Sequence, residues 1–131
     1  MLWGEILDII IINSADTPIY EQIAKQIKDA ILKGELKEGD LLPSVRALAK
    51  DLNISVITTR RAYDELERQG YTVNMIGKGT FVAAQNMEML KESRYKAIEE
   101  SLAQVVDYSI SIGISKEEIV EIINLLYEGE R

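Results

Sequence analysis

The sequence contains neither cysteine nor histidine among its 131 residues. Without cysteine the chain cannot form disulfides, thiolate metal sites or thiol nucleophiles, and this fits a reducing cytoplasm. Without histidine as well, Ser-His-Asp and Cys-His catalysis are excluded, as are zinc sites built on imidazole or thiolate. Only carboxylate, lysine or tyrosine chemistry, or a hard cation held by carboxylates, remains open. We therefore expect no enzyme activity, no cofactor and no bound metal.

Long hydrophobic runs are also scarce. The isoleucine run at residues 9–12 is far too short to span a bilayer, and no basic segment precedes it. This run predicts a buried strand or a packing arm. No other stretch resembles a membrane span or an export signal, so we expect a cytoplasmic protein with no membrane partner.

The net charge of −7 at first argues against a nucleic-acid partner, which usually needs a basic surface. The charges are unevenly distributed, however. Residues 15–83 carry ten basic and ten acidic side chains, whereas residues 84–131 carry five basic and ten acidic ones. Within the neutral part, the segment from Ser44 to Arg61 contains four cations and a single carboxylate, Asp51. This segment therefore predicts a local positive face.

Three helices are expected in the first two thirds of the chain. Asp16 or Thr17 is expected to cap the first helix, which has an apolar face at three- and four-residue steps and ends at Gly34. A short extended segment then precedes a second helix, which opens at Pro43-Ser44 and closes at Asn53-Ile54. Ser55 is expected to cap a third helix that runs to Gln69, with Thr59, Ala62, Tyr63 and Leu66 as its apolar stripe.

A hairpin and two further helices complete the pattern. Residues 71–75 alternate like a strand, residues 76–79 form a loop, and residues 80–82 form the return strand. A long helix follows from about Asn86 to a break at Gly113, and a capping box at residues 115–118 begins the last helix. Because these two helices cannot bury their apolar faces against each other alone, we expect a homodimer that pairs through Leu90, Ala97, Ile98, Leu102, Val105, Ile119, Ile122, Ile123 and Leu126.

The order helix, helix, helix, hairpin is typical of a winged helix-turn-helix, whose recognition helix enters the major groove of DNA. The predicted fold is therefore mainly α with a small β-hairpin wing. Residues 1–84 are expected to form the DNA-binding domain with an N-terminal strand or arm, and residues 85–131 a helical dimerisation region.

Three segments resemble the DNA-binding domain of the GntR family of bacterial regulators: PIYEQI at residues 18–23, GELKEGDLLPSVR at 34–46 and GKGTFV at 77–82. The short region of two helices at the end resembles the YtrA subfamily, whose members are dimers and often regulate transporter operons. The resemblance implies a repressor that binds double-stranded DNA, and the twofold symmetry of a dimer predicts an inverted-repeat operator with half-sites about one helical turn apart. It leaves open whether a small-molecule effector exists.

The resemblance also implies the DNA-contacting residues. Arg46 matches the family's DNA-contacting arginine at the start of the second helix, and Thr58 and Arg60 match contact positions of the recognition helix. The predicted DNA-binding set is Ser44, Arg46, Lys50, Ser55, Val56, Ile57, Thr58, Arg60, Arg61, Gly77 and Lys78.

The chain departs from the family at one point of the recognition helix. Many members have arginine and then a polar residue after the capping serine, whereas this chain has Val56 and Ile57. Apolar contacts with thymine methyl groups would replace base reading by arginine there, which suggests a target richer in A·T pairs. The same two side chains, with the overall acidity, leave a second hypothesis open: a winged-helix protein-interaction module that does not bind DNA.

Overall fold

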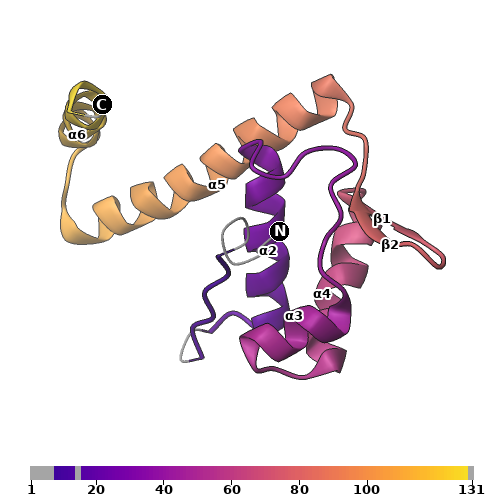
Figure 1. Ribbon diagram of the computed structural model, residues 1–131. Helices are drawn as coiled ribbons and strands as arrows, with labels where there is room; N and C mark the ends of the chain where they lie inside the picture. The colour runs from indigo at the N-terminus through magenta and orange to yellow at the C-terminus, as the bar shows by residue number, and fades with distance from the viewer. Residues whose placement is uncertain (1–7, 14–15, 130–131) are drawn as a thin grey trace. The chain divides into compact units, whose positions relative to one another are not determined.

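The computed structural model of the chain describes residues 8–13 and 16–129. Its elements are, in order, α2 (Ile19–Leu32), α3 (Val45–Leu52), α4 (Val56–Arg68), β1 (Thr72–Met75), β2 (Gly79–Val82), α5 (Met87–Ile112) and α6 (Lys116–Glu128). Figure 1 shows the β1–β2 hairpin projecting from the three-helix part. The predicted fold class, mainly helical with a hairpin wing and two helices after it, is confirmed.

The chain divides into two compact units, and the boundary along the sequence falls between Leu90 and Lys91. The division lies inside α5, because this helix begins as an extension of the first unit at Met87. The functional boundary that the sequence predicts between residues 84 and 85 remains a prediction.

Helix α2 begins differently from the predicted start. Pro18 itself occupies the N-cap, and its carbonyl accepts the amides of Glu21 and Gln22 at 3.1 and 3.2 Å. Among the described residues no side chain caps this end, so the prediction that Asp16 or Thr17 is the cap is wrong. Thr17 and Asp16 lie one and two positions before this N-cap, which Pro18 occupies with its ring-fixed φ of −55°. The predicted end is confirmed, since Gly34 has a φ of +81°.

The isoleucine run before α2 is an arm. Gln26 accepts from the Ile10 amide at 2.9 Å and donates to its carbonyl at 2.7 Å, and Gln22 bonds both groups of Ile12 at 2.9 and 3.0 Å. The alternative of a buried strand is wrong: no described residue forms a sheet with this run, and Ile10 and Ile12 are exposed. Two glutamine amides one helical turn apart satisfy the extended backbone in place of a neighbouring strand.

Helix α4 is the centre of the first unit, because it packs against both α2 and α3. Its predicted apolar stripe is confirmed, with all four side chains buried: Thr59, Ala62, Tyr63 and Leu66. The Tyr63 hydroxyl donates to the Pro43 carbonyl at 2.7 Å, and burial raises the pKa of this phenol well above its usual range. This bond, together with the packing of α3 on α4, holds the start of α3 against α4 in the helix-turn-helix.

Serine caps begin both helices of this motif, as predicted. The Ser44 hydroxyl accepts the Ala47 amide at 3.0 Å, and the Ser55 hydroxyl accepts the Thr58 amide at 3.0 Å. Between the two helices the chain turns at Asn53, which is left-handed with φ 57°.

The hairpin is antiparallel, with Thr72 opposite Val82 and Met75 opposite Gly79. The segment before α3 lies along β2. Leu41 forms an isolated β-bridge with Phe81, and the Leu42 amide donates to the Thr80 carbonyl at 2.9 Å. The sheet itself has only two strands, and this bridge and the packing of β1 on α4 support it. The bridge also holds the hairpin beside the start of α3.

The second unit consists of most of α5 and all of α6. The chain turns between them at Gly113, which has a φ of +79°, and the predicted capping box of Ser115 and Glu118 begins α6. Of the α5 residues, all of which the structure describes, only Ser109 is buried, and every residue of α6 is at least partly exposed. In the described part of the chain no helix is long and apolar enough to cross a membrane.

Candidate nucleic-acid interface

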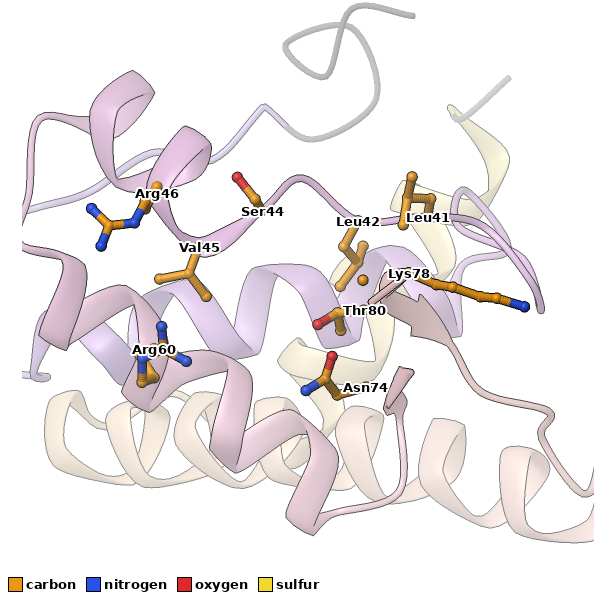
Figure 2. A pocket seen from close by; sticks show the side chains of 10 residues that line it. Leu41, Leu42, Ser44, Val45, Arg46, Arg60, Asn74, Lys78 and Thr80 are labelled. Carbon is orange, nitrogen blue, oxygen red and sulfur yellow. The ribbon is translucent and has the colours of Figure 1, made fainter. Parts of the chain in front are cut away.

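A groove of about 410 Å³ lies between the first turn of α3, the second turn of α4 and the hairpin. Its polar lining consists of Ser44, Arg46, Arg60, Asn74, Lys78 and Thr80, and Leu41, Leu42, Val45 and Gly79 complete it. Figure 2 shows the guanidinium groups of Arg46 and Arg60 at one end and Lys78 at the other, with its ammonium group pointing away from the groove. We call this feature the cationic groove.

The lining of the cationic groove carries three cations and, among these ten described residues, no carboxylate. Arg46, Arg60 and Lys78 are all exposed. Although residues 15–83 balance at zero net charge, three of their ten cations line this one groove. Such a surface favours a polyanion, since guanidinium groups bind phosphates or base edges in a bidentate manner.

Six residues of the groove are absent from the predicted set, and two of these six, Asn74 and Thr80, have polar side chains. Asn74 and Thr80 are cross-strand partners, so their side chains lie on the same face of the hairpin. The signal was available, because two polar side chains in adjacent strands, once paired in register, fall on one face. The sequence prediction places the wing contacts only at Gly77 and Lys78, near the tip, and so leaves out these two strand residues.

The residues in the first turn of α4 differ in how far their side chains are exposed. Ile57 is 81% exposed, whereas Val56 and Thr58 are half-buried. The Ser55 hydroxyl donates to the Thr58 hydroxyl at 2.8 Å, so these two side chains are engaged with each other at the cap. Ile57 and Arg60 are three residues apart and therefore neighbours on one exposed face of α4.

The structure does not bring every predicted contact residue to the groove. The guanidinium of Arg61 lies over the Tyr20 ring of α2, 3.9 Å from its centroid. Lys50 is exposed on the last turn of α3, outside the groove lining, and Gly77 lies at the tip of the hairpin.

Comparison with known proteins identifies this architecture. Residues 19–82 match the model of the bacterial regulatory proteins of the gntR family. Over 107 residues the chain is 39% identical to the HTH-type transcriptional repressor YtrA of Bacillus subtilis (strain 168), covering 82% of each protein. The chain belongs to the GntR family. It is therefore a DNA-binding transcription regulator of the YtrA-like type and not an enzyme, and the hypothesis of an interaction module without DNA binding is rejected.

Solved structures of GntR-family regulators agree with this assignment. YtrA from Sulfolobus acidocaldarius is 40% identical, with a TM-score of 0.57, over 70% of this chain and 97% of that one. A GntR family regulator from Listeria monocytogenes is 31% identical, with a TM-score of 0.70, over 87% of this chain and 97% of that one. The high coverage of both structures shows that the similarity extends beyond the winged helix.

This GntR-family chain also has an apolar groove of about 680 Å³ between α5 and α6. Six of the residues predicted for dimerisation line it: Leu102, Val105, Ile119, Ile122, Ile123 and Leu126. The other three, Leu90, Ala97 and Ile98, lie outside the lining. We call this feature the α5–α6 groove.

Proposed function

We propose that the protein is a cytoplasmic, homodimeric repressor that binds an inverted-repeat operator. In each copy the cationic groove and the first turn of α4 contact one half-site. The resemblance to the YtrA subfamily extends this proposal to an operon for a transporter. The observation that carries it is the gathering of Arg46, Arg60 and Lys78 around one groove at the start of the recognition helix.

The residues of the groove suit two kinds of contact. Arg60 lies on the first half of α4 with Ile57 on the same face, so both would reach base edges when α4 enters the major groove. Arg46 lies on α3 and Lys78 on the hairpin, at opposite ends of the cationic groove in Figure 2. We assign these two cations to the phosphates that border the groove, where they would fix the orientation of α4.

The pairing of two copies is proposed from the second unit. Leu102, Val105 and Ile122 are all more than 40% exposed in a single chain, although they line an apolar groove. An exposed apolar surface of this kind indicates an interface. A second copy placing its own α5 and α6 there would cover it and relate the two DNA-binding units by a twofold axis.

Replacement of Arg60 tests this proposal. Random-sequence duplexes are selected with the wild-type protein, and the selected duplex is titrated with wild type and Arg60→Ala. Arg60→Ala should lose about 1–3 kcal/mol of binding free energy. Arg68→Ala is the matched control, because Arg68 is an exposed arginine at the opposite end of α4 that pairs with Glu65. An Arg60→Ala protein that binds like Arg68→Ala would contradict the assignment.

A further inference from the structure

The tip of the hairpin carries an isoleucine with no role in the packing of the chain. Ile76 is 97% exposed, more than any other large apolar side chain that the structure describes. The turn is closed by a hydrogen bond from the Lys78 amide to the Met75 carbonyl at 2.9 Å, and Gly77 has a φ of +77°. The turn thus favours glycine at residue 77, whereas residue 76 does not have a positive φ and can carry an ordinary side chain.

The position of Ile76 relates it to the cationic groove. Lys78 and Gly79 line that groove, and Ile76 lies beyond them at the end of the same hairpin. A ligand that covered the groove and extended past Lys78 would reach Ile76. The apolar side chain is therefore continuous with the DNA-binding surface rather than isolated on another face.

The shape of the DNA duplex determines which groove the Ile76 side chain would contact. When the recognition helix occupies the major groove, a wing beside it reaches the adjacent backbone and minor groove. In minor-groove complexes, apolar side chains such as isoleucine insert between base steps and kink the duplex. Pyrimidine–purine steps, TA and CA, are the steps that unstack most easily.

We propose that Ile76 is a specificity-determining residue that inserts into the minor groove at a TA or CA step beside each half-site. Lys78 binds the phosphate next to this step. The protein thus reads the flank of its operator through the ease with which the DNA deforms, in addition to the bases that α4 contacts. This inference rests on the proposed DNA-binding function.

The test compares wild type and Ile76→Ala on the duplex selected by the wild-type protein and on the same duplex with the step under the wing changed to GC. Wild type should lose affinity by at least about fivefold on the changed duplex. Ile76→Ala should bind the selected duplex more weakly by a similar factor and should not distinguish the two duplexes. Energy transfer between dyes at the two ends should show a smaller bend with the variant.

Two control variants separate the possible causes. Ile10→Ala removes an exposed isoleucine from the arm and should change neither affinity nor bend. Lys78→Ala should weaken binding to both duplexes equally and lower the slope of log affinity against log salt by about one. The thermal midpoint of Ile76→Ala should equal that of wild type, because the side chain has almost no contacts.

The outcomes are distinct. An Ile76→Ala protein that binds and bends the selected duplex like wild type overturns the inference and leaves the proposed function standing. An Ile76→Ala protein that is weaker but still distinguishes the two duplexes also overturns it, because the step is then read by another residue. A wild-type protein that selects no sequence overturns the proposed function and this inference together.

Discussion

The two units of the chain differ in how far they bury their apolar side chains. In the first unit the stripe of α4 is covered by α2 and α3, and Thr59 and Ala62 have no exposed surface at all. In the second unit the side chains that face the α5–α6 groove remain open, and Leu126 is 64% exposed. The first unit therefore completes its core within one chain, whereas the second leaves an apolar surface exposed.

The two regions also differ in net charge. Residues 15–83 are neutral overall, and residues 84–131 have twice as many acidic as basic side chains. An acidic helical region repels the phosphates of DNA, so its charges do not contribute to DNA affinity. We infer that DNA affinity depends on a few cations in the cationic groove and on having two such grooves per molecule. The predictions below test this division of roles.

The largest effect is expected from a charge in the α5–α6 groove. Ile122→Asp places a carboxylate in the surface that the second copy would cover, where an unpaired charge is costly. The variant should be monomeric, and its affinity for the inverted repeat should fall roughly 10²- to 10⁴-fold because the two half-sites are no longer bound together. Light scattering and a DNA titration measure the two changes.

The matched control for this variant is Asn124→Asp. It introduces the same charge two residues away on α6, at an exposed position outside the groove lining. It should remain dimeric and bind normally. If Ile122→Asp also remains dimeric, the α5–α6 groove is not the interface.

A smaller effect is expected at the start of α4. Ile57→Ala removes the apolar side chain next to Arg60 and should cost about 1–2 kcal/mol on the selected duplex. Deoxyuridine in place of thymidine removes only the methyl group that Ile57 is proposed to contact. Wild type should bind the deoxyuridine duplex more weakly, and Ile57→Ala should not. If wild type binds both duplexes equally, Ile57 has another role.

The smallest effect concerns pH and the start of α6. Hydrogen bonds from Ser115, first from its backbone amide and then from its side chain, lower the pKa of the Glu118 carboxyl. A carboxyl whose pKa is lower in the folded state stabilises the fold above its unfolded pKa of about 4.3 and loses this contribution as the pH falls through the folded value. Circular dichroism from pH 5 to pH 3 should show a loss of thermal stability that is reduced in Glu118→Gln.

Much of the first unit was predictable because local signals agree there. The serine caps at Ser44 and Ser55, the stripe of α4 and the turn at Gly34 each follow from short-range rules. The arm was only partly predictable, since its partners Gln22 and Gln26 lie on a different element and have side chains that usually face solvent.

The features of the site that could not be predicted from the sequence depend on contacts between separate helices and strands. The stacking of Arg61 on Tyr20 requires the packing of α4 against α2, so a run of two arginines does not show which one points to the groove. Asn74 and Thr80 line the groove together because the register of the hairpin places them opposite each other. The order of motifs, in contrast, predicted the winged helix and the family.

The most direct test of the account is the stoichiometry of the protein on its selected duplex and on the same duplex cut to one half-site. Sedimentation of the wild-type protein with a labelled duplex measures both complexes. We predict two chains on the full site, and a large loss of affinity when one half-site is removed. One chain on the full site, or equal affinity for the half-site, would contradict the claim that two cationic grooves act together.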